Sequence, residues 1–259
     1  VRAGDFTGDG NVDLVISRIC WDDSLNNPQP IQIFVGDGRG GFVDQTSAVF
    51  NGSVPTTNYV ARMLIADFNN DGASDIYCID EGDDGVIQKG QNKLFLSASD
   101  HKIINATSIL PQESVFTHGA SSGDINNDGR IDILANHMVQ KANDMQMQGA
   151  SGQFVINNAT LPKSIEYATN TWSALIDVNG DGWRDMMLGT WSGNPNPSQV
   201  FLNDGHGSFS SSVGVNLPRS GVNDEAVVAI QSIDLNGDKL ADLVLSVTDG
   251  GSSSGYYKV

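Results

Sequence analysis

Short apolar runs bounded by glycine and aspartate recur along the whole chain. They are two or three residues long. None of the longer stretches of the sequence shows the 3.6-residue periodicity of apolar positions that a helix requires. Runs of this length and flanking composition predict buried β-strands. The clearest runs occupy residues 14–16, 63–65, 76–77, 133–134, 174–176, 186–188 and 243–245.

Five copies of a nine-residue, aspartate-rich segment alternate with these runs. The pattern is D-x-[N/T]-x-D-[G/K]-x-x-D, and an apolar run follows every copy directly. The starts of successive copies are separated by 62, 57, 53 and 57 residues, which indicates a repeat protein. We call these segments the Asp loops; they occupy residues 5–13, 67–75, 124–132, 177–185 and 234–242.

A second signature follows later in the repeat and reads as strand, glycine-rich turn and strand. It is clear at 33–42 and 200–209 and weaker at 94–104 and 147–156. Such a pattern predicts a β-hairpin. Each repeat therefore contains about four strands: one into the Asp loop, one out of it, and a hairpin. Four-stranded repeats of this kind predict an all-β fold of the β-propeller type. A β-sandwich would not explain a loop repeated once in every unit.

The predicted organisation is one propeller domain over residues 1–259, with repeats that start near 1, 59, 117, 170 and 227. The fifth repeat is incomplete, so about five blades are visible. The chain opens on Val1 without an initiator methionine. We therefore expect a processed form or a fragment of a longer protein, although a shorter closed ring is the alternative.

The chemistry of the Asp loops favours calcium. Side-chain oxygens fall at positions one, three, five and nine, and a backbone carbonyl is available at position seven. Ca²⁺ takes six to eight oxygen ligands, whereas Mg²⁺ keeps several waters and transition metals prefer His or Cys. Glycine at position six allows the tight turn. The predicted ligands, with position seven contributing its carbonyl, are Asp5, Thr7, Asp9, Asn11 and Asp13; Asp67, Asn69, Asp71, Ala73 and Asp75; Asp124, Asn126, Asp128, Arg130 and Asp132; Asp177, Asn179, Asp181, Trp183 and Asp185; and Asp234, Asn236, Asp238, Leu240 and Asp242.

Two other interpretations of the loops were weighed. An EF-hand needs a glutamate at position twelve, but that position is uncharged in all five copies. Metal-free, Asx-rich turns would place three carboxylates close together without a cation, which is unfavourable. The fifth loop carries Lys239 instead of glycine, which adds backbone strain and a positive charge that oppose calcium binding. In the first loop, Thr7 replaces asparagine and can still provide one oxygen.

Charge and composition agree with cation binding. Fourteen Lys and Arg face 31 Asp and Glu, giving a net charge of −17. Such a surface disfavours binding to nucleic acid or anionic lipid. No apolar run is long enough for a transmembrane helix, so membrane insertion is not expected. Five Ca²⁺ ions would reduce the net charge to −7, and calcium is expected to raise thermal stability.

The Asp loops and the hairpin at 200–209 resemble FG-GAP/VCBS repeats, the calcium-binding blades of the integrin α-subunit propeller and of many secreted proteins. The resemblance covers nearly the whole chain. It implies a propeller, usually of seven blades, with the calcium loops on one face. It also implies an extracellular, secreted or cell-surface setting. Of the family's functional residues, only the metal ligands match positions in this sequence.

The strand order suggests a second site at the ends of the strands opposite the Asp loops. Aromatic residues there would stack on sugar rings, while polar residues would bond the hydroxyls; alternatively, the aromatics plug the channel or pack between blades. Trp183 lies inside an Asp loop and is expected on the other face. The candidate ligand-binding residues are Trp21, Arg62, His118, His137, Trp172 and Trp191, with Tyr59 beside them.

The predicted function is therefore an extracellular, calcium-stabilised binding module for adhesion, with a glycan or an extracellular protein as partner. Two alternatives remain: a purely structural repeat of a surface protein or filament, and an accessory or catalytic domain of a polysaccharide-degrading enzyme. The sequence has no recognisable catalytic constellation. G-x-S-x-G occurs around Ser121 and Ser253, but no helix follows either copy.

The two cysteines and the three glycosylation sequons give little information about the function. Cys20 and Cys78 could form one bridge or remain two separate buried thiols. Three N-glycosylation sequons begin at Asn51, Asn105 and Asn158, which is compatible with a eukaryotic glycoprotein.

Overall fold

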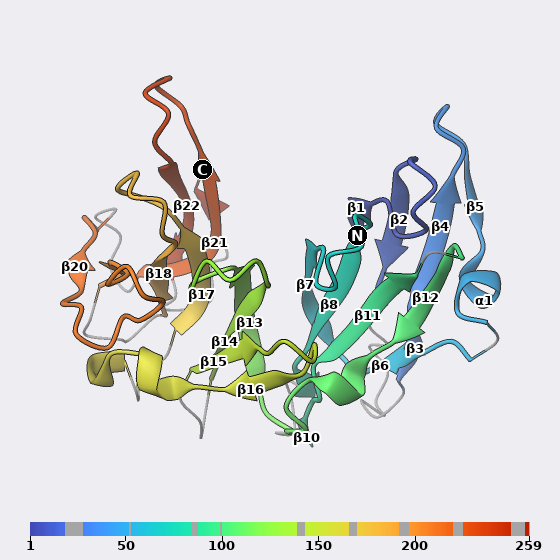
Figure 1. Ribbon diagram of the computed structural model, residues 1–259, viewed down its shortest axis with the longest axis horizontal. Coiled ribbons are helices and arrows are strands. Elements are labelled where there is room, and N and C mark those ends of the chain that lie inside the picture. The colour runs from blue at the N-terminus through green and yellow to red at the C-terminus, as the bar shows by residue number, and fades with distance from the viewer. Residues whose placement is uncertain are drawn as a thin grey trace. The chain divides into compact units, whose positions relative to one another are not determined.

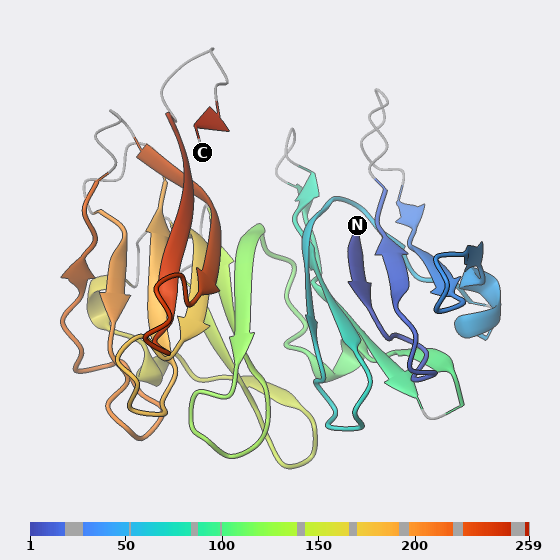
Figure 2. The same cartoon turned by 90° about the horizontal axis from the view of Figure 1, so that it is seen from above.

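The computed structural model describes residues 1–18, 28–51, 53–83, 88–98, 100–138, 143–165, 170–191, 197–219, 225–249 and 257–258. In these ranges the chain is built from antiparallel sheets with very little helix (Figures 1 and 2). The all-β prediction is confirmed. The helical elements are α1 (Thr46–Val49) and three 3-10 turns, η1 (Thr107–Ile109), η2 (Asn158–Thr160) and η3 (Lys163–Ile165).

Four sheets of four strands follow one another along the described chain, as predicted for successive blades. Within each, hydrogen-bonded neighbours are consecutive strands of the sheet, so each sheet is a simple meander. The first contains β1 (Arg2–Gly4), β2 (Asp13–Ile16), β4 (Gln32–Gly36) and β5 (Phe42–Asp44); the second β7 (Val60–Ala66), β8 (Asp75–Asp80), β11 (Lys93–Ala98) and β12 (Lys102–Asn105); the third β13 (Thr117–Gly123), β14 (Asp132–His137), β15 (Asp144–Gln148) and β16 (Phe154–Ile156); and the fourth β17 (Asn170–Ile176), β18 (Asp185–Thr190), β19 (Gln199–Phe201) and β20 (Val215–Asn216).

The fifth sheet has three strands in its described part, β21 (Glu225–Ile233), β22 (Asp242–Asp249) and β23 (Tyr257–Lys258). The predicted incompleteness of this blade stays a prediction, because residues 250–256 lie outside the described ranges. Two small ribbons complete the strands: β3 (Gln29–Pro30) pairs with β6 (Thr56–Thr57), and β9 (Gly82–Asp83) pairs with β10 (Gln88–Lys89).

The second strand of the second, third and fourth sheets is completely buried. Every residue of β8, β14 and β18 is shielded from solvent. These strands begin with the last aspartate of an Asp loop and continue into the apolar run. The short uninterrupted runs in the sequence therefore mark inner strands that are covered on both faces.

The chain divides into two compact units. Unit 1 comprises Val1–Thr117 and Gln148–Val155, and unit 2 comprises His118–Met147 and Ile156–Val259. Each has its own apolar core: Ile33, Ile76 and Phe95 lie at the centre of unit 1, and Ile125, Met186 and Phe201 at the centre of unit 2. The single propeller domain over 1–259 stays a prediction. Among the described residues, no helix is sufficiently long and apolar to cross a membrane.

Candidate functional site

Each Asp loop joins the first strand of a sheet to the second. The loops connect β1 to β2, β7 to β8, β13 to β14, β17 to β18 and β21 to β22. The register of β17 and β18 shows the arrangement: Ile176 pairs with Asp185 next to the loop, and Asn170 pairs with Thr190 at the other end. The predicted position of the loops at one end of every sheet is confirmed.

The aspartate at position one ties the loop together. In the first loop, Asp5 accepts the backbone amides of Asp9 at 3.1 Å and Gly10 at 2.8 Å. Carboxylate bonds to backbone amides fix a tight turn as an Asx motif does. The same pair of bonds joins Asp67 to Asp71 and Gly72, Asp124 to Asp128 and Gly129, and Asp177 to Asp181 and Gly182, whereas Asp234 accepts the amides of Gly237 and Lys239.

The aspartate at position five holds the next part of the loop in the same way in all five copies. Asp9 accepts the amide of Asn11 at 2.8 Å, and this bond aligns position seven. The equivalent bonds link Asp71 to Ala73, Asp128 to Arg130, Asp181 to Trp183 and Asp238 to Leu240. Positions one and five thus present their carboxylates from a loop of fixed backbone shape.

Position three differs between the first loop and the others. The amide nitrogen of Asn69 donates to Asp71 at 2.9 Å, and its oxygen accepts the amide of Asp71 at 3.1 Å. The same contacts recur at Asn126, Asn179 and Asn236. In the first loop, the hydroxyl of Thr7 instead donates to Asp13 at 3.2 Å, and Thr7 is buried. Thr7 is therefore occupied as a support for Asp13.

The aspartate at position nine is buried in the first four loops and half-buried in the fifth, and its hydrogen bonds brace the fold, a role that the sequence pattern did not reveal. One oxygen of Asp13 accepts the amides of Phe6 and Thr7, and the other accepts the amide of Gly36 in β4. One carboxylate thus connects the loop, the second strand and the hairpin. The equivalent bonds join Asp75 to Phe68 and Ser97, and Asp185 to Val178 and Asn203; Asp132 accepts the amide of Ile125, and Asp242 that of Leu235.

Burial and neighbouring charge both act on these braces. Burial raises the pKa of Asp75 to about 6, although bonds from Ser97 and Phe68 favour the charged form, and Asp71 adds repulsion. Burial likewise raises the pKa of Asp185, with Asp181 and Asp177 contributing in the same direction. A cation bound in the loop would favour the charged forms.

The donor set suits calcium on chemical grounds. Each loop offers three carboxylates, an amide or hydroxyl oxygen at position three and a carbonyl at position seven, all hard oxygen ligands. In the first loop each oxygen of Asp5 accepts one loop amide, so a second lone pair on each remains for a metal. Within the described ranges, no group of three or more His, Cys, Asp or Glu side chains forms a ready metal cluster.

The backbone at position six has the predicted left-handed conformation. Gly10, Gly72, Gly129 and Gly182 have φ between 82° and 89°, and Lys239 has φ 70° without being glycine. Position four is left-handed as well, which sequence reasoning missed. Its residues are Gly8, Asn70, Asn127, Gly180 and Gly237, the residue types that tolerate this region.

Comparison with family models decides what these repeats are. A model described as FG-GAP-like repeat matches residues 5–78, 67–135 and 177–245, which together cover more than half of the chain. The chain belongs to the FG-GAP-like repeat family. FG-GAP-like repeats are typically extracellular, and they generally form non-catalytic modules that bind partners or support structure. None of the curated proteins matches this sequence.

The candidate ligand-binding residues, predicted at the strand ends opposite the Asp loops, are divided between the two units. Tyr59 and Arg62 belong to unit 1, whereas His118, His137, Trp172 and Trp191 belong to unit 2. Trp21 lies outside the described residues. Arg62 and Trp172 occupy equivalent places, each directly after a register shift in the first strand of its sheet. β-bulges of this kind redirect side chains and are frequent beside functional sites.

His118 and Trp191 come together in unit 2. Their rings meet edge to face with centroids 5.7 Å apart, and both side chains are half-buried. His137, in contrast, is only 2% exposed, and its Nε2 lies 2.9 Å from Asp144. That burial leaves His137 no surface on which a sugar could stack, so the structure does not support it as a ligand-face residue.

Trp183 contacts the hairpin turn beside its own loop. Its ring lies 6.4 Å from that of His206, between centroids. Asp204 in this turn accepts the amides of His206 and Ser208, and Asp37 accepts those of Arg39 and Gly41 in the first repeat. The predicted glycine-rich hairpin turns are therefore also closed by a carboxylate.

The three sequons are not equivalent. Asn105 is exposed, and its oxygen accepts the amide and hydroxyl of Thr107. Asn51 is exposed with φ 51°. Asn158 uses both ends of its amide: its nitrogen donates to Asp144 and its oxygen accepts the amide of Met145. These bonds make Asn158 the least suitable of the three acceptors.

Cys78 is a buried free thiol in β8. Burial raises the pKa of its thiol, and Asp80 adds to this effect while Lys93 opposes it. Cys20 lies outside the described residues. The finding agrees with the alternative of separate thiols.

Proposed function

We propose that this chain is an extracellular binding module whose FG-GAP-like repeats bind calcium and which recognises a glycan or protein partner in adhesion. The observation that carries the proposal is the recurrence of one loop, with the same hydrogen bonds, at one end of five successive sheets. Three carboxylates held at fixed positions in one short loop repel each other, and a bound cation would relieve this repulsion.

Calcium would have a structural role. The brace at position nine already links the Asp loop to the second strand and the hairpin, as Asp75 does through Phe68 and Ser97. A cation between positions one, three, five and nine would hold these parts together and reduce repulsion such as that between Asp71 and Asp75. Millimolar calcium outside cells would fill even weak sites of this type.

Recognition would then fall to the ends of the strands opposite the loops. The half-buried pair of His118 and Trp191 and the half-buried side chain of Trp172 provide aromatic surface in unit 2. Aromatic side chains with polar neighbours are typical of recognition surfaces.

The test is binding of the purified, calcium-loaded chain to arrays of glycans and of extracellular proteins, repeated in chelator. We expect calcium-dependent binding to a defined partner. Replacement of Trp172 and Trp191 by alanine should abolish it while the melting temperature in calcium stays above that in chelator. Trp183→Ala is the matched control, because Trp183 lies at the loop end. Binding that survives the double substitution would contradict the proposed surface.

A further inference from the structure

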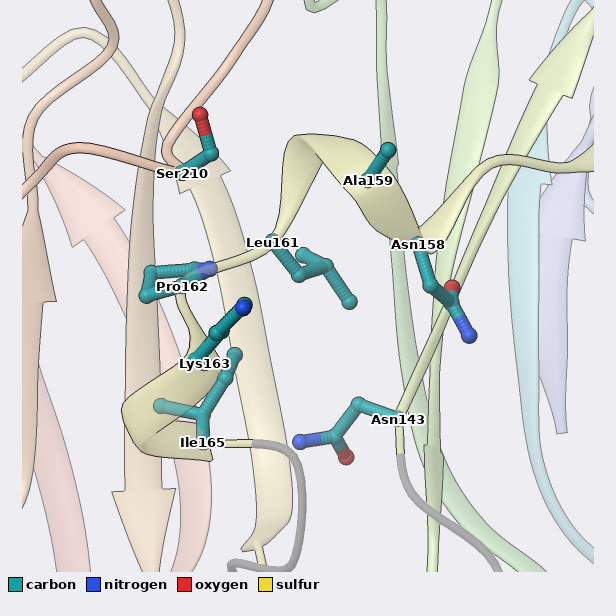
Figure 3. A pocket seen from close by; sticks show the side chains of 8 residues that line it. All are labelled: Asn143, Asn158, Ala159, Leu161, Pro162, Lys163, Ile165 and Ser210. Carbon is teal, nitrogen blue, oxygen red and sulfur yellow. The ribbon is translucent and has the colours of Figure 1, made fainter.

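A cavity within unit 2 lies apart from the Asp loops. Its volume is about 470 Å³, which is in the range of small-molecule sites, roughly 300–1,000 Å³. Figure 3 shows its wall, formed by the turns that follow β16 and by the segment that leads into β15. The lining residues are Asn143, Asn158, Ala159, Leu161, Pro162, Lys163, Ile165 and Ser210.

One side of the cavity is apolar and firmly held. Leu161 and Ile165 belong to the core of unit 2, and Pro162 between them is buried. They lie on and between the short turns η2 and η3. A surface of this kind suits the C–H face of a small ring rather than a charged chain.

A buried amide donor faces this apolar side. Asn143 is only 1% exposed, and its Nδ2 has no hydrogen-bond partner within the described part of the chain. In Figure 3 that nitrogen points toward the turn that carries Lys163 and Ile165. Buried polar groups are normally paired, so an unpaired donor on a cavity wall indicates a site for an acceptor.

A hydrogen-bond chain orients this amide. The hydroxyl of Ser173 donates to the oxygen of Asn136 at 2.6 Å, and the nitrogen of Asn136 donates to the oxygen of Asn143 at 3.3 Å. Ser121 lies 2.8 Å from Ser173 at the start of the chain. Because the oxygen of Asn143 is used as an acceptor, its nitrogen remains for the cavity.

Lys163 supplies a positive charge at the opening. It is exposed, and within the described residues it makes no ion pair. No Asp or Glu side chain is among the described residues that line the cavity. Asp144, which follows Asn143 in the chain, is fully buried, and its two oxygens bond His137 and Asn158. The lining thus offers one neutral donor, Nδ2 of Asn143, and one cationic donor, Nζ of Lys163. Of the other polar lining residues, Asn158 has both ends of its amide bonded, and the hydroxyl of Ser210 accepts a bond from Ser208.

We propose that this cavity binds an acidic sugar of the hexuronic acid class. The carboxylate would accept hydrogen bonds from Nδ2 of Asn143 and Nζ of Lys163, and a ring face would rest on Leu161, Pro162 and Ile165. The inference rests on the proposed binding function and names the ligand class of one site.

The test titrates the calcium-loaded full chain with glucuronate and galacturonate, and in parallel with glucose and galactose as neutral controls. N-acetylglutamate serves as a carboxylate without a sugar ring. We expect saturable binding of at least one uronate, at least tenfold tighter than that of its neutral counterpart. Asn143→Ala should abolish the binding, and Lys163→Gln should weaken it about fivefold, as expected for an exposed charge. Lys102→Gln removes the same charge in unit 1 and should have no effect.

Equal affinity for uronates and neutral sugars would overturn the proposal, as would binding of N-acetylglutamate alone or no binding at all. If Asn143→Ala does not fold, Lys163→Gln and Lys163→Glu decide, because Lys163 is exposed and both variants should fold. Melting temperatures in calcium and in chelator distinguish a failure of the cavity proposal from a failure of the proposed function. A chain stabilised by calcium that binds no uronate contradicts only the cavity proposal, whereas a chain indifferent to calcium contradicts the proposed function.

Discussion

Replacing the brace Asp13 by alanine should destabilise the protein strongly even when no calcium is present. In the structure its carboxylate accepts the amides of Phe6 at 3.0 Å, Thr7 at 3.2 Å and Gly36 at 3.0 Å. All three residues are buried, so alanine would leave their amides without a partner and out of reach of water. Asp9 in the same loop is exposed and bonds one exposed amide, that of Asn11.

The size of the effect follows from these contacts. A buried donor that loses its partner costs about 1–3 kcal/mol, and three are affected. Relaxation of the loop and partial access of water will reduce the sum, so we expect Asp13→Ala to lower the free energy of unfolding by about 3–5 kcal/mol. Asp9→Ala should cost less than about 1 kcal/mol in chelator, because solvent replaces the lost bond.

The assay is urea unfolding in chelator, combined with amide hydrogen exchange at Phe6, Thr7 and Gly36. Asp13→Ala should lower the unfolding midpoint and accelerate exchange at these three amides, while Asp9→Ala leaves them protected. In calcium, both variants should lose the stabilisation contributed by the first loop. Equal destabilisation by the two substitutions in chelator would refute the idea that position nine braces the fold independently of metal.

Three further predictions concern backbone conformation, thiol reactivity and the buried hydrogen bond between His137 and Asp144. Gly72→Ala should cost about 1–2 kcal/mol in thermal or urea unfolding, because φ is +89° and an added Cβ meets nothing within 4 Å, so the cost is purely conformational. Lys239→Gly should raise the free energy of unfolding by about 1 kcal/mol, because φ of Lys239 is positive. Gly149→Ala is the control and should be nearly neutral, because the added Cβ would make only an ordinary van der Waals contact. If Gly72→Ala were also neutral, the turn would not be strained. In a Cys20→Ser variant, Cys78 should react with a disulfide reagent only on unfolding, since it is fully buried and its pKa is raised, and rapid labelling of the native protein would contradict this. His137→Ala should destabilise by about 1–3 kcal/mol, because it removes one of the two side-chain partners of the fully buried Asp144. The exposed His206→Ala should cost less than about 0.5 kcal/mol, and similar losses would place His137 near solvent.

The fold could be predicted from the sequence because the repeat fixes where strands begin. Every Asp loop ends in an aspartate that is also the first residue of the next strand, as Asp75 is of β8. The left-handed backbone at position six of the Asp loops was predictable, because glycine occupies this position in four of the five loops. Position four carries the same signal, because it is always Gly or Asn, but this composition is also usual for turns without a left-handed residue.

The site was predictable only in part, because side-chain roles depend on contacts between distant residues. Nothing in the pattern distinguishes position nine from positions one and five, yet Asp13 reaches Gly36 across the sheet. Likewise, His137 sits at a strand end where solvent contact was expected, and its burial depends on Asp144 in the neighbouring strand. The cavity near Asn143 is lined by residues that are up to 67 positions apart in the sequence, from Asn143 to Ser210. No local sequence pattern predicts that these residues lie close together.

The most direct test of the calcium proposal measures metal content and stability together. The chain is stripped with chelator and titrated with CaCl₂ by calorimetry, and melting temperatures are recorded in millimolar calcium and in chelator. The account predicts up to five bound ions per chain, one for each Asp loop. It also predicts a clear rise in melting temperature, since each site filled at one hundred times its Kd adds about 2.7 kcal/mol. No bound calcium, or equal melting temperatures in calcium and chelator, would contradict it.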